Sequence, residues 1–225
     1  MGKSLNRQNP QPPRGRFGKI FSRKGVNHVT SLGRNRTMVD NSNLKVTLIM
    51  VMSANGVVAQ DKDQDSFEWN SDADRDQLLE RIQSIGTVLM GANTYRIIED
   101  NLYEKVNFFV LSHHPASFRP RERVSFIQGE AADVCRQLCE KSVKHVALLG
   151  GTETNAHFLD AGRVDDIYLT IEPLLLPGGF GLTKNLKDIC RLTLESVRKL
   201  ENRNTLLLHY RVLKEDPGPP DIETS

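Results

Sequence analysis

The chain has 225 residues, of which 30 are Lys or Arg and 28 are Asp or Glu, giving a formal net charge of +2 with 38% hydrophobic and 6% aromatic residues. This length suits one ordinary domain with tails and excludes a large multidomain protein. The longest apolar run, residues 46–52, is far shorter than the roughly 20 residues that cross a bilayer, which excludes an integral membrane protein of the helical kind.

The three cysteines are too few and too scattered for a disulfide framework, and their spacing completes no zinc site. They are Cys135, Cys139 and Cys190. The sequence therefore predicts a cytoplasmic protein without a structural metal.

The first 43 residues differ in composition from the rest of the chain. They carry nine cations and one acid, Asp40, so this leader has a charge of +8 and leaves −6 for the remainder. It contains too few apolar residues to offset the entropy of ordering, which predicts disorder. The leader is compatible with a cationic tail, a nucleic-acid-binding arm, an organellar presequence, or an untranslated stretch before a true start at Met38. The composition of residues 214–225 predicts a second disordered tail, so the folded domain is expected at residues 44–213.

Strand-like and helix-like runs alternate along this domain. In chain order, the expected elements are a strand at 45–51, a helix at 72–84, a strand at 87–90, a short helix at 94–98, strands at 106–111 and 124–127, a helix at 131–140, a strand at 145–149, a helix at 153–161, and strands at 166–171, 192–200 and 205–213. Residues 201–204 predict a hairpin between the last two strands. Strands that are apolar on both faces and alternate with helices predict a three-layer α/β fold, with a mostly parallel sheet and an antiparallel C-terminal edge hairpin.

Ligands of such sheets collect beyond the carboxyl ends of the strands. The double glycine Gly150-Gly151 follows one strand and precedes a helix that begins near Thr152, Glu153 and Thr154. Two glycines permit a turn without side chains, and the free N–H groups of the helix start could then hold a diphosphate. Glu153 would repel an anion unless its side chain points to solvent. A plain strand-to-helix turn is the alternative.

Three other places in the sequence have side chains that could contact a ligand: the ends of two further strands and the start of one helix. Gly91 and Thr94 repeat the pattern of a glycine before a helix, although Thr94 alone is no more than an N-cap. Ser112 and His113 follow the next strand and could hold another phosphate, or could simply be solvated. Ser71 and Asp74 have the spacing of a capping box, in which Ser71 caps the helix and Asp74 reaches back.

Several motifs, taken in order and spacing, resemble the dihydrofolate reductase-like fold over about residues 45–213. The likeness is closest to the reductase domain at the C-terminal end of bacterial riboflavin-biosynthesis deaminase-reductases. The motifs are Ser53-Ala-Asn-Gly56, Met90-Gly-Ala-Asn-Thr-Tyr95, Leu149-Gly-Gly-Thr152, Gly162-Arg-Val-Asp-Asp-Ile-Tyr-Leu169 and Pro173-Leu-Leu-Leu-Pro-Gly-Gly179.

The resemblance implies an NADPH-dependent oxidoreductase that transfers hydride to a pyrimidine of riboflavin biosynthesis, of the 5-amino-6-(5-phosphoribosylamino)uracil reductase type. It implies a nicotinamide near Met52 and Ser53. The remaining cofactor contacts would come from Gly91, Thr94, Ser112, His113, Gly150, Gly151, Thr152, Glu153 and Thr154. Asn55, Trp69 and Arg81 would contact the substrate, and Asp74 would be the catalytic acid.

Other interpretations stay open at this point. Trp69 followed five residues later by Asp74 also resembles dihydrofolate reductases, so dihydrofolate or another pterin is the alternative substrate. Leu149 stands where an acid is common and Asn55 replaces the usual aspartate, which leaves room for a relative without activity. A nucleic-acid-associated protein that uses the basic leader is a third possibility, although the acidic body argues against it. The final hairpin is apolar enough to need a cover, and members of the family that the chain resembles often dimerise through their later strands. We therefore expect a homodimer.

Overall fold

The structure is a computed structural model in which residues 44–62, 64–200 and 204–214 are described. The predicted leader and nearly all of the predicted C-terminal tail lie outside these residues. The strands are β1 (Lys45–Ser53), β2 (Thr87–Gly91), β3 (Asn107–Leu111), β4 (Val124–Ile127), β5 (His145–Leu148), β6 (Asp166–Glu172), β7 (Leu192–Lys199) and β8 (Leu206–Val212). The helices are α1 (Asp72–Ile85), α2 (Ala92–Ile98), α3 (Ala131–Glu140) and α4 (Thr152–Asp160), with short 3₁₀ turns at Ser66–Glu68, Glu99–Asn101 and Pro115–Ser117.

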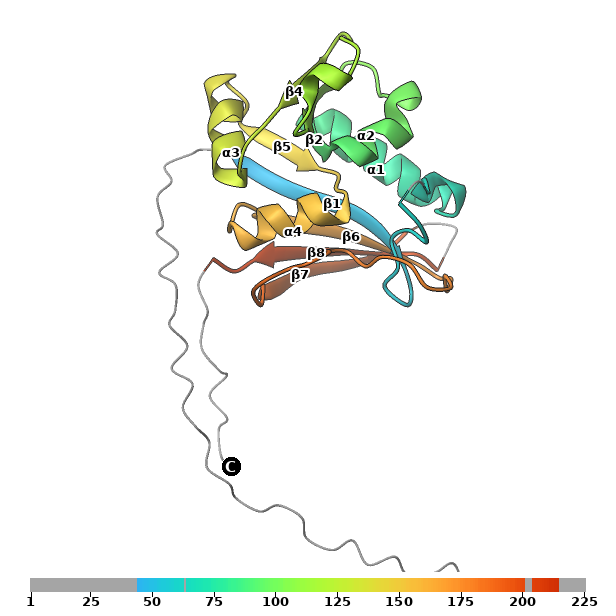
Figure 1. Cartoon of the computed structure of the whole chain (residues 1–225). Helices are drawn as coiled ribbons and strands as arrows, with labels where there is room; N and C mark the ends of the chain where they lie inside the picture. The colour runs from blue at the N-terminus through green and yellow to red at the C-terminus, as the bar shows by residue number, and fades with distance from the viewer. Residues whose placement is uncertain (1–43, 63, 201–203, 215–225) are drawn as a thin grey trace, which may run out of the picture. The chain divides into compact units, whose positions relative to one another are not determined.

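Every strand and helix expected from the sequence occurs, with ends that differ by one or two residues. The strands form a single eight-stranded sheet in the order β4-β3-β2-β5-β1-β6-β8-β7 (Figure 1). The first six strands in this order run parallel, whereas β8 pairs antiparallel with β6 and with β7. The predicted fold class is confirmed. The turn of the final hairpin falls largely on residues 201–203, outside the described residues.

Helices cover both faces of the sheet, as the continuous apolar strands require. One core lies between the sheet and α3 and α4, and it includes Leu48, Leu89 and Phe158. The other lies between the sheet and α1 and α2, and it includes Val88 and Tyr95. Of the helices in the described part of the chain, none has the length and apolar character to cross a membrane.

The loop after β1 and the segment after β6 are joined by backbone hydrogen bonds. Ala54 N donates to Leu174 O at 2.8 Å, and Phe180 N donates to Ala59 O at 2.7 Å. Gly179 has a φ of +104°, and a Cβ there would collide with the carbonyl oxygen of Ala59. The close approach of two backbones therefore explains why the Pro173–Gly179 motif ends in glycine. This contact fixes the loop at the carboxyl end of β1.

Candidate active site

The predicted glycine segments after β2 and β5 meet at one edge of the sheet. Gly91 N donates to Gly150 O at 2.7 Å. A Cβ added to Gly91 would lie 2.5 Å from Thr154 Oγ1, and one added to Gly151 would lie 3.2 Å from Thr94 Oγ1. The start of α4 therefore packs directly on the start of α2. These contacts bring together Gly91, Thr94, Gly150, Gly151 and Thr154.

The amino end of α4 is open to an anion. Gly151 is the N-cap residue and makes no side-chain cap hydrogen bond, and the peptide bond between Gly150 and Gly151 is cis. The N–H groups of the first helical turn have no intrahelical partner and carry a partial positive charge. The Glu153 carboxylate would repel a bound anion, but its charge is offset by Lys184, whose Nζ donates to Glu153 Oε1 at 2.6 Å. These donors fit the diphosphate of a dinucleotide.

Ser53 and Asn55 use their polar atoms within the loop after β1. The buried Ser53 hydroxyl donates to Asn55 Oδ1 at 2.7 Å and accepts from Val57 N at 3.0 Å. Asn55 Nδ2 donates to Leu176 O at 2.8 Å. Both side chains therefore shape the loop, and they leave Met52 and the loop backbone as the groups at the end of β1.

Ser112 and His113 lie beyond β3, on the side of β2 that faces away from Gly150. Ser112 is buried, and its Oγ accepts from His114 N at 3.0 Å. His113 is exposed. The two residues therefore stand at the far end of the row of loops that also contains Gly91 and Gly150.

Asp74 lies on the other side of β1, where the first turn of α1 contacts Thr170 and Glu172 of β6. It is 3% exposed and accepts a hydrogen bond from Asn70 Nδ2 at 2.8 Å. Burial raises the pKa of Asp74 above its ordinary value, and the charge of Glu172 adds to this effect. Hydrogen bonds to Thr170 and Asn70 and the charge of Arg75 oppose it. Asp74 is thus a buried carboxyl group beside the carboxyl end of β6.

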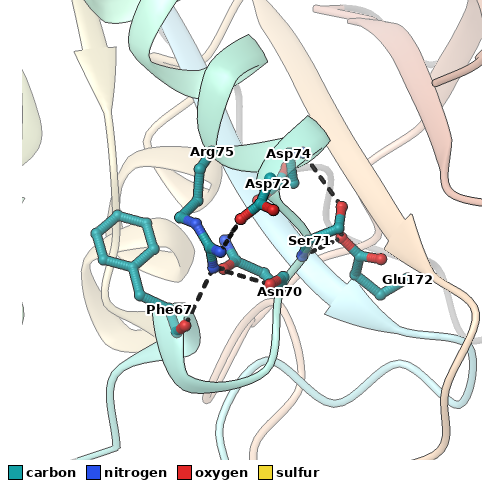
Figure 2. Close-up of polar contacts among 7 residues, drawn as sticks. All are labelled: Phe67, Asn70, Ser71, Asp72, Asp74, Arg75 and Glu172. Atoms are coloured by element: carbon teal, nitrogen blue, oxygen red, sulfur yellow. Dashed lines mark hydrogen bonds and ion pairs between the residues drawn. The ribbon is translucent and has the colours of Figure 1, made fainter. Parts of the chain in front are cut away.

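The predicted capping box is only half correct. Ser71 Oγ accepts from Asp74 N at 3.2 Å, as expected. The Ser71 N–H, however, donates to Glu172 Oε1 at 2.8 Å instead of to the Asp74 carboxylate. Figure 2 shows Asp74, Ser71 and Glu172 in this arrangement, with Arg75 on the side of Phe67. Because Glu172 holds the helix cap, the carboxyl group of Asp74 is released from that role.

The structure places Arg81 away from Asp74. Arg81 lies seven residues further along α1, about 10 Å at the usual helical rise. Its guanidinium is 3.5 Å from the centre of the Tyr168 ring and donates to Gln77 Oε1 from Nε at 3.0 Å. It therefore lies toward the amino end of β6, whereas Asp74 lies toward the carboxyl end.

Two buried donors flank Asp74 along the chain. Trp69 Nε1 and Gln77 Nε2 are buried and lack a hydrogen-bond partner within the described residues. Burying a hydrogen-bond donor without an acceptor destabilises an ordinary protein core. Such donors suit a binding site, where the carbonyl or ring-nitrogen atoms of a heterocycle can accept from them. Trp69 was expected from the sequence and Gln77 was not.

Three other polar residues of this region were missed by the sequence analysis. Thr170, Glu172 and Thr205 are all buried. Glu172 left a signal, because it is the only charged residue between Asp166 and Arg191 that stands directly at the end of an apolar strand, just before Pro173. Thr170 and Thr205 resemble ordinary strand residues, so nothing in the sequence marks them.

Comparisons with known proteins agree with this fold. Residues 103–206 match the model of the RibD C-terminal domain. The uncharacterized protein YwjB of Bacillus subtilis (strain 168) is 23% identical over 173 residues, which span 74% of this chain and 97% of YwjB.

Two solved structures share the fold. One is the diaminohydroxyphosphoribosylaminopyrimidine deaminase/5-amino-6-(5-phosphoribosylamino)uracil reductase of Thermotoga maritima, with a TM-score of 0.59 and 16% identity over 75% of this chain and 56% of that chain. The other is the dihydrofolate reductase of Enterococcus faecalis complexed with NADP(H), with a TM-score of 0.56 and 14% identity over 76% of this chain and 97% of that chain.

The eight-stranded sheet, the order of its loops and the family match point to one group of proteins. The fold of the chain is dihydrofolate reductase-like, and residues 103–206 match the RibD C-terminal domain.

Proposed function

We propose that the chain is an NADPH-dependent reductase of the riboflavin type, which transfers a hydride to a phosphoribosylamino-pyrimidine. The single observation that carries this proposal is the placement of two features on opposite sides of β1. The glycine segments at Gly91 and Gly150-Gly151 lie on one side, and the buried carboxyl group of Asp74 lies on the other. A dinucleotide held by the first would present its reduced ring near Met52, next to a heterocycle held by the second.

The residues around α4 fit the cofactor by their donor chemistry. The N–H groups of Thr152, Glu153 and Thr154 would hold the diphosphate, and Thr94 lies beside Gly151 to contact the adjoining phosphate or ribose. Ser112 and His113 would contact the 2′-phosphate. NADPH, when bound, supplies the hydride.

Asp74 would act on the substrate and not on the cofactor. A buried carboxyl group with a raised pKa can stay protonated closer to neutral pH than an exposed one, so it can donate a hydrogen bond or a proton to a ring nitrogen. Hydride addition to a C=N bond needs one proton at nitrogen, and Asp74 can supply it. Trp69 would cover the ring, and Asn55 would hold the loop that closes on it.

A pterin such as dihydrofolate is the second candidate substrate. Asp74 lies five residues after Trp69 and is hydrogen-bonded to Thr170, an arrangement that suits the amino and ring N–H edge of a pterin as well as that of a pyrimidine. The position of Arg81 is compatible with this alternative, because Tyr168 and Gln77 engage its guanidinium.

NADPH oxidation measured side by side with the two substrates tests the proposal. We expect turnover with the phosphoribosylamino-pyrimidine, and a kcat/KM with that substrate at least about tenfold above that with dihydrofolate, a difference equivalent to about 1.4 kcal/mol of transition-state binding. The reverse ratio would establish the pterin alternative. Absence of NADPH binding in a fluorescence titration would refute both.

We also propose that the protein is a homodimer that buries the β7 edge. All eight residues of β7 are exposed, and Leu194 and Val197 are 51% and 54% exposed. A long exposed edge strand that carries apolar side chains is a template for pairing unless something covers it.

Light scattering is expected to give twice the chain mass of 25.4 kDa. The double variant Leu194→Lys/Val197→Lys should give the monomer mass, because two buried charges would face the partner across the interface. Ser196→Lys, which changes a residue on the other face of the same strand, is the matched control and should stay dimeric. A monomeric wild-type protein would contradict the proposal.

A further inference from the structure

Glu172 is a buried carboxylate that accepts hydrogen bonds from Ser71 and Thr205 beside the proposed site. It is 3% exposed. Its Oε1 accepts from Ser71 N at 2.8 Å and from Ser71 Oγ at 2.6 Å, and its Oε2 accepts from Thr205 Oγ1 at 2.8 Å. Each of these is an acceptor contact, which is the pattern of an ionised group. A negative charge therefore lies at the junction of α1, β6 and the start of β8.

The same residue is connected to Asp74 through Ser71. Ser71 Oγ donates to Glu172 and accepts from Asp74 N, so a continuous chain of hydrogen bonds joins the end of β6 to the first turn of α1. In an ordinary capping box the carboxylate three residues after the cap would accept from the cap N–H. Here Glu172 takes that contact from another strand, and Asp74 faces Thr170 and Asn70 instead.

We propose that Glu172 is a positioning residue for Asp74: through Ser71 it fixes the first turn of α1 on β6, and it places a second buried negative charge beside the Asp74 carboxyl group. The two acids have different roles: Glu172 accepts the hydrogen bonds of the cap residue Ser71, and this leaves the Asp74 carboxyl group free to face the substrate. This inference rests on the proposed reductase function for its catalytic consequence, but its physical content concerns the free protein.

The charged and titratable groups that face Asp74 decide the direction of the effect. They are Glu172 on β6, Arg75 on α1 and Tyr103 from the segment before β3, with Thr170 and Asn70 as neutral hydrogen-bond partners. Arg75 donates to Phe67 O at 3.2 Å and to Asn70 Oδ1 at 2.8 Å, so the surrounding turn engages its guanidinium. Burial and the charge of Glu172 both favour the protonated acid at Asp74.

The decisive experiment titrates Asp74 in the free protein by carbon NMR of its carboxyl group, assigned with Asp74→Asn. Glu172→Gln is the test variant, because the amide keeps an oxygen for the Ser71 donors and removes the charge, while its NH2 group can donate to the Thr205 hydroxyl. We expect Asp74 to titrate at lower pH in Glu172→Gln than in the wild type. An indistinguishable titration would overturn the proposal.

Matched variants separate this role from simple loss of structure. Asp133→Asn removes one exposed charge on α3, on the other face of the sheet, and should leave the titration unchanged. Ser71→Ala keeps both charges but breaks the hydroxyl bridge, so we expect an unchanged titration and a higher KM for the heterocycle. If Glu172→Gln does not fold, Glu172→Asp withdraws the charge by one methylene and should move the titration in the same direction by a smaller amount; an unchanged curve in that variant would equally overturn the proposal.

Kinetics then connect the titration to the reaction. If the reaction requires protonated Asp74, the active enzyme is the fraction in which Asp74 is protonated. At a pH above the titration midpoint, lowering that midpoint by one pH unit reduces this fraction about tenfold. The alkaline limb of kcat/KM for NADPH-dependent reduction should therefore move to lower pH in Glu172→Gln, in step with the NMR midpoint. A shifted titration without turnover in any variant would refute the reductase function and leave the placement of Glu172 standing, whereas turnover with an unshifted titration would do the opposite.

Discussion

Asp74→Asn lowers kcat for NADPH-dependent reduction by about 10²- to 10⁴-fold, the usual contribution of a positioned general acid. The amide keeps an acceptor for Asn70 Nδ2, so the fold should be preserved while the acidic proton of the carboxyl group is lost. Binding of NADPH should be unchanged, because Asp74 lies across β1 from the glycine segments. Steady-state kinetics and a fluorescence titration with NADPH measure the two effects separately.

Asp72→Asn is the control, since Asp72 is an exposed acid on the same helical turn and pairs with Arg75. It should retain wild-type turnover. Wild-type turnover in Asp74→Asn itself would show that the acid has no part in the reaction.

Asp74→Asn should also change how the free energy of unfolding depends on pH. The folded-state pKa of Asp74 is raised, mainly by burial, so its contribution to stability is complete below the ordinary pKa of 3.8 and is lost as pH rises through the folded-state pKa. Each pKa unit of that rise lowers the free energy of unfolding by about 1.4 kcal/mol once the group is ionised. Asp74→Asn should therefore be more stable than the wild type at pH 8, and the difference should shrink toward pH 4. Urea unfolding at the two pH values measures it.

Gly91→Ala should weaken NADPH binding and destabilise the fold together. The added Cβ would lie 2.5 Å from Thr154 Oγ1, so the start of α4 must move away from β2. Such overpacking typically costs about 1–3 kcal/mol of stability. Displacement of the α4 start should also raise KM for NADPH at least about tenfold, equivalent to about 1.4 kcal/mol of binding free energy.

A double variant tests the cause. Thr154→Ala removes the oxygen that Gly91→Ala would strike, so Gly91→Ala/Thr154→Ala should unfold at the same urea concentration as Thr154→Ala alone. Gly181→Ala is a glycine control, because a Cβ there meets its nearest neighbour at 3.7 Å and should be tolerated. A Gly91→Ala protein with unaltered stability and NADPH affinity would show that α4 does not pack as described.

Local patterns in the sequence carry much of the fold. The apolar runs of the parallel strands and the periodic helices fix where elements begin and end to within one or two residues, because burial on both faces leaves few alternatives. Glycines mark the turns for a similarly local reason, as at Gly56, where φ is +82°. The glycine segments at Gly91 and Gly150 were therefore predictable as candidate cofactor contacts.

The acid site was less predictable, because its geometry depends on contacts distant in the sequence. Ser71 and Asp74 have the local spacing of a capping box, yet Glu172, 101 residues after Ser71, replaces Asp74 in it. Likewise, the hydroxyl of Ser53 and the amide of Asn55 were expected to face a ligand, but they close their own loop through Val57 and Leu176.

The sequence alone determined the alternation of strands and helices and the turns, because these depend on hydrophobic period and backbone freedom within short stretches. The tertiary structure alone decided that β8 inserts between β6 and β7, that Arg81 lies against Tyr168, and that Glu172 and not Asp74 accepts from the N–H group of the cap residue Ser71. The physical reason is that a buried polar group takes whichever partner the fold brings within hydrogen-bond reach, and sequence spacing does not reveal that partner.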